Sequence, residues 1–241
     1  MKTAIIIPSH LHAKRLPNKP LLLINNEPMI VHVWKQAKKT NIEEVVVATS
    51  DQEIFDVIKK CGGKSILTSN HHTNGSDRIF EAVASLESKP NLIINVQGDM
   101  PLINPDAINY LENFMKAGKA EMSTLASSLE MKDMINPNVV KVETNDKINP
   151  NQFSTAKDFF RTKDAREDCL YHHVGIYAYQ YPILKKYVGL HKTKNELERS
   201  LEQMRALDNN INIHVGFVKD YPLGVDTQED LDKIRLLYNE K

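Results

Sequence analysis

Residues 5–21 read IIIPSHLHAKRLPNKPL and carry the clearest structural signal in the chain. The apolar start has the composition of a buried strand, which Pro8 ends. The loop that follows is basic, with Lys14, Arg15 and Lys19. Ligands of open parallel sheets bind just outside the carboxyl ends of the strands, so this position predicts a polyphosphate site. The alternative is an ordinary solvated basic loop.

Similar apolar segments recur along the first half of the chain and alternate with helical patterns. Strands are expected at 4–7, 45–48, 65–67 and 92–96, with helices starting near Pro28 and Asp51 between them. Strands rich in Ile and Val separated by helices are typical of a parallel sheet covered on both faces. We therefore predict an α/β fold with a doubly wound, mostly parallel sheet.

The second half of the chain has a different rhythm, without repeats or low-complexity tracts. It predicts helices, strands and one long irregular polar stretch at 145–169. The helices are expected at 105–116, 195–207 and 227–238, and the strands at 122–126, 139–143, 174–179 and 211–218.

The composition limits the classes of function. The 241 residues contain 31 Lys plus Arg and 31 Asp plus Glu, so no overall charge favours nucleic acid or an anionic membrane. Cys61 and Cys169 are too few for a disulfide framework and suit a reducing compartment. The apolar run at 4–7 is far shorter than the roughly 18 residues of a membrane span. We expect a cytoplasmic protein.

Two aspartates are candidate magnesium ligands. Asp99 follows the strand at 92–96 behind Gln97 and Gly98, and Asp226 precedes the final helix. Magnesium prefers one or two carboxylates plus substrate phosphates. The alternatives are a strand-ending turn for Asp99 and a helix cap for Asp226.

Two further polar motifs have simpler readings. The loop at 73–78 leads into a helix and is read either as a nucleotide contact or as a capped helix start. The histidine pairs at 71–72 and 172–173 have no partners at zinc-like spacing, so no zinc site is predicted. The glycine fingerprints of P-loop and dinucleotide-binding proteins are absent, which argues against a dehydrogenase.

Taken together, the motifs resemble those of the 3-deoxy-manno-octulosonate (Kdo) cytidylyltransferases, which make CMP-Kdo for lipopolysaccharide synthesis. The resemblance covers nearly the whole chain. It rests on IIIPS and RLPNKPL, then NEPMIVHV (26–33), VATSD (47–51), CGG (61–63), NGSDR (74–78), INVQGD (94–99), NPNVVKV (136–142), HVGIYAY (173–179), LEQMRAL (201–207) and GVDTQEDL (224–231).

The resemblance implies transfer of CMP from CTP to the anomeric 2-hydroxyl of Kdo, with release of pyrophosphate, in a Mg²⁺-dependent homodimer. It implies catalytic roles for Lys19, Asp99 and Asp226, the two aspartates holding the metal. The implied nucleotide site is Pro8, Ser9, His10, Lys14, Arg15, Lys19, Asn74, Gly75, Ser76, Asp77, Arg78 and Gln97. The implied sugar site is Gln97, His173, Tyr177, Glu202 and Gln203.

The implied architecture is one Rossmann-like, GT-A-like nucleotidyltransferase domain. Its nucleotide-binding part comprises about residues 1–125 and 210–241, and a smaller mixed α/β lobe at about 126–209 serves sugar binding and dimerisation.

The chain departs from the family pattern at several positions. His10 and Ala13 replace an arginine and a serine of the basic loop, which Lys14 is expected to offset. Met100 and Arg199 replace glutamates.

Thr155 stands where the family has an arginine near the sugar acid, and Lys157, Arg161 or Arg166 are its candidate substitutes. Two alternatives therefore stay open: activation of a modified Kdo or another acidic sugar such as a sialic acid, and a nucleotide-binding regulator without turnover.

Overall fold

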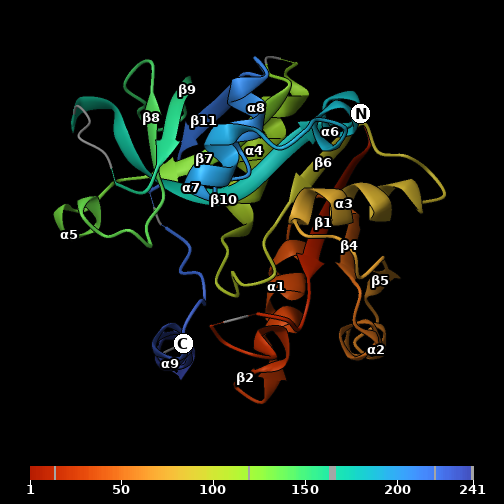
Figure 1. The fold of residues 1–241 in the computed structure, drawn as a ribbon. Helices are drawn as coiled ribbons and strands as arrows, with labels where there is room; N and C mark the ends of the chain where they lie inside the picture. Colours follow the sequence, from red (N-terminus) through yellow and green to blue (C-terminus); the bar gives the residue numbers. More distant parts are fainter. Residues whose placement is uncertain (14, 119, 163–166, 220, 240–241) are drawn as a thin grey trace. The chain divides into compact units, whose positions relative to one another are not determined.

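The computed structural model describes residues 1–13, 15–118, 120–162, 167–219 and 221–239 (Figure 1). The chain forms two compact units. The first comprises Met1–Tyr110 with Pro222–Lys241, and the second comprises Leu111–Tyr221. The helix α4 (Pro105–Lys116) runs across the boundary in the sequence.

The first unit is built on four parallel strands. Their order is β5 (Lys64–Leu67), β4 (Glu44–Thr49), β1 (Thr3–Ser9) and β6 (Leu92–Asn95). After β1 the chain adds β4 and β5 on one side and then places β6 on the other side of β1. The predicted parallel sheet is confirmed, and its direction of winding reverses between β1 and β6.

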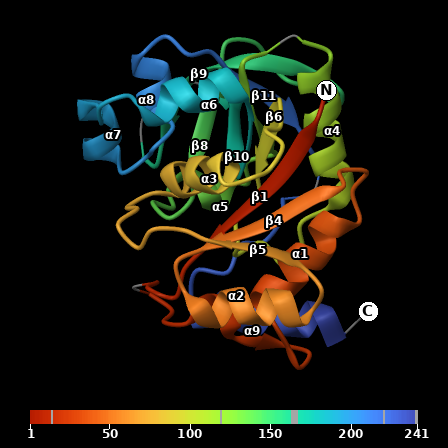
Figure 2. The same ribbon diagram turned by 90° about the vertical axis from the view of Figure 1, so that its right-hand side faces the viewer.

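Helices cover both faces of this sheet (Figures 1 and 2). α1 (Met29–Lys38) and α2 (Gln52–Lys60) pack beside each other on one face, and α3 (Gly75–Ala84) covers the opposite face. This arrangement follows from right-handed crossovers that continue in one direction and then reverse. Because both faces are covered, the central side chains of β1 are fully buried.

A short N-terminal hairpin completes the first unit together with the C-terminal helix. A 3-10 turn, η1 (Lys19–Leu21), leads into β2 (Leu23–Ile24) and β3 (Glu27–Pro28). α9 (Gln228–Asn239) packs against this region through a small apolar cluster. The cluster comprises Leu16, Ile24, Met29, Val225, Leu231 and Ile234.

The second unit contains a mixed sheet of five strands: β7 (Met122–Ser127), β8 (Lys141–Thr144), β9 (Phe153–Phe160), β10 (Leu170–Gln180) and β11 (Ile213–Phe217). Only β7 and β11 pair in parallel among these strands. The pairings run β10–β7–β11–β9–β8 and return to β10, so they form a closed circuit. The remaining elements are α5 (Met131–Met134), η2 (Glu167–Cys169), α6 (Tyr181–Val188), α7 (Lys194–Arg199) and α8 (Met204–Asp208).

Two sequence-based predictions for this unit were wrong. The stretch at 145–169 is not irregular, because β9 lies within it and pairs with both β8 and β11. Its anchor is the Phe153 ring, which stacks on Phe114 at 3.5 Å between centroids and covers Gly216 so closely that a Cβ there would lie 2.4 Å from the ring. These contacts are non-local, so the local composition of β9 does not reveal them.

The charged segment at 195–207 is likewise not one helix. Ser200 adopts a left-handed conformation (φ 52°) that ends α7, and α8 begins at Met204. Glu196 explains why the two short helices stay together. Its carboxylate accepts two hydrogen bonds from Arg205, Nε to Oε2 at 2.8 Å and Nη2 to Oε1 at 2.5 Å, and both side chains are buried. Thr193 caps α7 in a box with the same glutamate.

No helix in the described ranges is long and apolar enough to cross a membrane.

Removing one partner of the buried Glu196–Arg205 pair leaves the other charge uncompensated. We expect Glu196→Ala to lower the free energy of unfolding by about 3–5 kcal/mol. The double substitution Glu196→Met/Arg205→Met should cost less than Glu196→Ala alone, since no lone charge remains. Urea unfolding of the three proteins measures this, and a Glu196→Ala protein as stable as the parent would contradict it.

Candidate functional site

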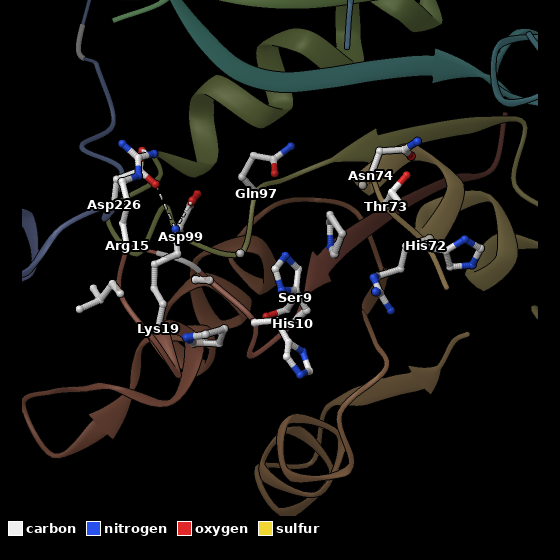
Figure 3. Close-up of a pocket in the computed structure, with 18 residues that line it drawn as sticks. Ser9, His10, Arg15, Lys19, His72, Thr73, Asn74, Gln97, Asp99 and Asp226 are labelled. Carbon is white, nitrogen blue, oxygen red and sulfur yellow. Dashed lines mark hydrogen bonds and ion pairs between the residues drawn. The ribbon is translucent and has the colours of Figure 1, made fainter. Parts of the chain in front are cut away.

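A pocket of about 420 Å³ lies in the first unit, at the carboxyl ends of β1 and β6 (Figure 3). These are the strands between which the winding direction reverses, the place where open α/β sheets bind ligands. The lining residues are Pro8, Ser9, His10, His12, Ala13, Arg15, Leu16, Lys19, Pro20, His72, Thr73, Asn74, Gly75, Arg78, Gln97, Gly98, Asp99 and Asp226.

Asp51 holds the start of the loop after β1. This residue precedes α2, but its side chain makes no cap of that helix. Instead, Asp51 Oδ2 accepts a hydrogen bond from the Leu11 amide at 3.0 Å. The Leu11 carbonyl in turn accepts from the amides of Ala13 and Asn18 at 2.9 and 3.2 Å. These bonds connect the described residues Leu11, Ala13 and Asn18 of the loop to one another and to Asp51.

Arg15, Lys19, Asp99 and Asp226 converge at one end of the pocket (Figure 3). Lys19 Nζ lies 2.7 Å from Asp99 Oδ2 and 3.2 Å from Asp226 Oδ1, and it also donates to the Val225 carbonyl at 2.8 Å. Arg15 Nη2 donates to Asp226 Oδ2 at 2.9 Å. Burial opposes the charge of Lys19, but the two carboxylates outweigh it and raise the pKa of the ammonium.

Backbone contacts hold the two aspartates together. The Val225 amide donates to the Asp99 carbonyl at 2.9 Å, which ties the segment before α9 to the end of β6. The cap of α9 is formed by Thr227 and Asp230: the Thr227 hydroxyl accepts from the Asp230 amide, and the Asp230 carboxylate accepts from the Thr227 amide. Asp226 is therefore not the cap, and its carboxylate faces the two cations.

Gly98 brings the two strand ends close together. A Cβ at this position would lie 2.9 Å from the Pro8 carbonyl oxygen and 3.4 Å from Ser9 Cβ. Any larger residue would push the loop that carries Asp99 away from β1. The glycine between Gln97 and Asp99 is thus required for the geometry of the cluster.

The other end of the pocket is formed by the start of α3. Asn74 caps this helix by accepting from the Asp77 amide at 2.8 Å, so the capped-start interpretation is confirmed for a residue that also lines the pocket. Ser76 and Asp77 lie outside the lining. Arg78 is 4% exposed and donates to Thr68 Oγ1 and the Ser69 carbonyl at 2.5 and 3.3 Å. Burial lowers the pKa of its guanidinium.

His10 and Ser9 lie between the two ends (Figure 3). Burial and the nearby Arg78 lower the pKa of His10, which favours its uncharged form. The buried Ser9 hydroxyl has no hydrogen-bond partner among the described residues. The charges that the structure places at the lining for an anionic ligand are therefore those of Arg15, Lys19 and Arg78. Lys14 lies outside the described residues.

Thr73, the first residue of the loop read from the sequence as a nucleotide contact, lines the pocket, and so do His72 and His12, which the sequence did not indicate as ligand contacts. His72 had been considered only as a metal ligand. Its Nε2 bonds to the Glu81 carboxylate, which also accepts from the Ser69 amide through both oxygens. Burial works against it, but the bonds from His72 and Ser69 lower the pKa of Glu81. Glu81 follows Asp77 by four positions and Arg78 by three on α3. This i,i+3 and i,i+4 spacing could have indicated from the sequence that Glu81 lies on the same helix face as the NGSDR motif.

The candidate sugar residues other than Gln97 belong to the second unit. His173 is buried, and its ring nitrogen Nε2 lies 3.1 Å from the Thr124 hydroxyl. That hydroxyl donates to the Ile176 carbonyl at 2.6 Å, which assigns the His173 tautomer with a proton on Nε2. Burial lowers the pKa of His173 to about 3 and raises that of Tyr177 well above its ordinary value. Both rings are neutral hydrogen-bonding groups.

Glu202 and Gln203 lie in the turn before α8, and Gln203 is buried. The Glu202 carbonyl accepts from the Tyr187 hydroxyl at 2.7 Å. Gln97, in the first unit, lines the pocket and donates to Asn95 Oδ1 at 3.3 Å.

Thr155 brings no positive charge to the second unit. Its hydroxyl accepts from the Asn145 amide group at 2.7 Å. Lys157 is paired with Glu143 at 2.5 Å, and Arg161 donates to the Pro137 and Asn138 carbonyls. Arg199 is paired with Asp158 at 2.5 Å. Arg166 lies outside the described residues, and Met100 is buried at the end of the β6 loop.

The donor set of the pocket suits a hard divalent cation. Asp99 and Asp226 direct carboxylate oxygens at one shared cation, Lys19 Nζ. Within the described ranges, no group of three or more His, Cys, Asp or Glu side chains is placed to hold a metal. Two carboxylates completed by ligand phosphates and water are the arrangement that magnesium favours and zinc does not.

Comparisons with known proteins place this chain in a family. Residues 4–213 match the family model described as Cytidylyltransferase. A 3-deoxy-manno-octulosonate cytidylyltransferase of Brucella ovis is 42% identical over 239 residues, 98% of this chain and 95% of the relative. The chain belongs to the 3-deoxy-manno-octulosonate cytidylyltransferase family.

Two further comparisons agree with this membership. The 3-deoxy-manno-octulosonate cytidylyltransferase 2 of Actinobacillus pleuropneumoniae serotype 5b is 41% identical over the full length of both chains. A solved CMP:2-keto-3-deoxy-manno-octonic acid synthetase complexed with CTP superposes with a TM-score of 0.91 at 34% identity, covering 100% of this chain and 99% of the other. A more distant thymidylyltransferase from Bacillus anthracis (TM-score 0.70, 16% identity, 99% and 96% covered) shares the fold.

The close approach of Gly98 to the Pro8 carbonyl in this cytidylyltransferase can be tested by measuring the stability of variants. Gly98→Ala should lower the free energy of unfolding by about 1–3 kcal/mol, the usual cost of overpacking. Gly75→Ala is the matched control, because a Cβ there would contact Pro8 Cγ at an ordinary 3.6 Å. Urea unfolding should find the control within about 0.5 kcal/mol of the parent. Equal effects of the two substitutions would contradict the close-approach argument.

The depressed pKa of His173 predicts a pH dependence of stability. Between pH 6.5 and about pH 3, His173 binds a proton in the unfolded state but not in the folded state. The free energy of unfolding therefore rises with pH across this interval. The contribution is about 1.4 kcal/mol per pH unit. His173→Gln removes the titrating group, and the slope of unfolding free energy against pH should fall by about one proton equivalent. An unchanged slope would show that His173 titrates normally in the folded protein.

Proposed function

We propose that this protein transfers CMP from CTP to the anomeric 2-hydroxyl of Kdo, forming CMP-Kdo and pyrophosphate for lipopolysaccharide synthesis. The observation that carries the proposal is the convergence of Arg15 and Lys19 with Asp99 and Asp226 at the pocket edge. Family membership supplies the nucleotide and the sugar. In the reaction the hydroxyl oxygen bonds to the α-phosphorus, the bond to the β-phosphate breaks, and the hydroxyl proton passes to water.

The positively charged side chains would hold the triphosphate. Lys19 supplies a compact charge, and Arg15 supplies a planar fork that matches phosphate oxygens. The negative charge that develops on the leaving pyrophosphate is stabilised by such preorganised cations. His10, Ser9 and the α3 start, with Asn74, Gly75 and Arg78, would bind the nucleoside part.

Mg²⁺ is the proposed cofactor, held by Asp99 and Asp226. It would supply Lewis-acid chemistry, lowering the pKa of the sugar hydroxyl and neutralising charge on the phosphates. The two carboxylates fit it because they already share a cation in the structure. Lys19 and Arg15 then contribute the remaining positive charge from the protein itself.

The residues proposed from family resemblance for the sugar are Gln97 in the first unit and His173, Tyr177, Glu202 and Gln203 in the second unit. The neutral rings of His173 and Tyr177 suit hydrogen bonds with sugar hydroxyls. Thr155 is uncharged, so it cannot pair with the sugar carboxylate as an arginine does. This favours, as a second candidate, activation of a modified Kdo or another acidic sugar such as a sialic acid.

Three further properties are proposed from family resemblance: a GT-A-like arrangement with a sugar-binding and dimerisation lobe, a homodimer, and a cytoplasmic location. The cytoplasmic proposal is supported by the two free cysteines. Size-exclusion chromatography with light scattering tests the dimer.

A pyrophosphate-release assay that crosses four nucleotides with several sugar acids tests the proposed reaction. We expect turnover that requires CTP, a divalent cation and Kdo. Turnover with a different acidic sugar would select the second candidate. If calorimetry showed CTP binding but no sugar acid were turned over, the protein would be a nucleotide-binding regulator, and the proposed enzymatic activity would be rejected.

Asp99→Asn and Asp226→Asn should each lower kcat by about 10²–10³-fold, the usual loss for one electrostatic contact of a transition state. Lys64→Gln on β5 is the control, because Lys64 is exposed and both it and its partner Glu44 lie outside the pocket lining. Activity that survives both aspartate substitutions would remove the metal assignment.

A further inference from the structure

The four charged groups that converge at one end of the pocket neutralise one another. Lys19 and Arg15 contribute two positive charges, and Asp99 and Asp226 contribute two negative charges, within hydrogen-bond distance of each other. A divalent cation that arrives alone meets a cluster with no net charge. The same holds for a triphosphate that arrives alone. Only the two together bring an anion for the released cations and a cation for the released carboxylates.

Lys19 is the central member of the cluster. Its side chain is 13% exposed, whereas that of Arg15 is 57% exposed. An ammonium has three N–H donors. Asp99 Oδ2, Asp226 Oδ1 and the Val225 carbonyl accept from Nζ at 2.7, 3.2 and 2.8 Å, so all three donors have an acceptor. Lys19 therefore occupies the point on which both carboxylates converge.

We propose that Lys19 is an internal counter-ion that competes with the divalent cation for Asp99 and Asp226 in the nucleotide-free protein. The triphosphate relieves this competition by offering Lys19 another anion. Metal and nucleotide thus bind as a coupled pair, and the protein on its own holds the metal weakly. This inference rests on the proposed function for the identity of the two ligands.

The inference predicts opposite effects of one substitution on two ligands. Removing the charge of Lys19 should strengthen metal binding to the nucleotide-free protein and weaken CTP binding. A residue whose role is merely to support the fold would weaken both. Without the ammonium of Lys19, the two carboxylates have no cation to compensate their charge. A divalent cation then supplies the electrostatic stabilisation that Lys19 supplies in the parent protein.

The test uses Mn²⁺ as the probe, without nucleotide, followed by electron paramagnetic resonance of the free ion. Lys19→Gln should lower the Kd for Mn²⁺ by roughly 5- to 150-fold, the usual range of coupling between two ligands. Lys19→Arg retains the charge and should stay close to the parent value. Thermal unfolding shows whether Lys19→Gln folds. If it does not, Lys19→Met, which also removes the charge, is used for the same Mn²⁺ measurement.

Two controls define the result. Lys35→Gln removes a lysine that pairs with Glu27 outside the pocket, so it should leave Mn²⁺ binding unchanged. Adding Asp99→Asn to Lys19→Gln should abolish the gain. Mn²⁺ binding to the charge-removed Lys19 variants that is no tighter than in the parent, including no measurable binding at all, would overturn the proposal.

The outcome is separable from that of the proposed function. Tighter Mn²⁺ binding in Lys19→Gln, with a parent protein that turns over no sugar acid, would support the counter-ion and reject the enzyme. Normal turnover by the parent protein with unchanged Mn²⁺ affinity in the variant would reject the counter-ion alone.

Discussion

The position of the pocket depends on the parallel pairing of β1 with β4 on one side and β6 on the other. The direction of winding reverses between β1 and β6. Their carboxyl ends are therefore adjacent, and no crossover helix lies between them at this edge of the sheet. The basic loop leaves one strand end and Asp99 follows the other. Gly98 lets the two ends approach within contact distance of the Pro8 carbonyl. Without that approach, Lys19 and Asp99 would not meet.

Charge compensation is the second constraint on the site. Two carboxylates side by side repel each other, and a partly buried lysine loses solvation, so neither group is stable there alone. Their combination is stable, and the segment before α9 joins it through the Val225 backbone. Each of these side chains has a partner within the protein, so under the counter-ion proposal ligand binding is an exchange of partners.

The second unit uses buried polar groups differently. Arg205 and Glu196 form a fully paired ion pair that joins two short helices, whereas His173 and Tyr177 are kept neutral by burial. Neutral donors and acceptors suit a ligand rich in hydroxyl groups. Thr155, where the resemblance implies an arginine near the sugar acid, carries no charge, and Lys157 and Arg161, considered as its substitutes, have partners within the unit. The nature of the sugar is therefore the most informative property to measure.

The sequence by itself determined the parallel strands of the first unit, the basic loop and the two candidate aspartates, because buried strands and the residues at their ends have strong local patterns. The tertiary structure decided what lies far apart in the chain. It formed β9 through the contacts of Phe153 with Phe114 and Gly216. It also brought Asp226 onto Lys19 across 207 positions of sequence. Such pairings depend on packing between distant segments, which no local pattern encodes.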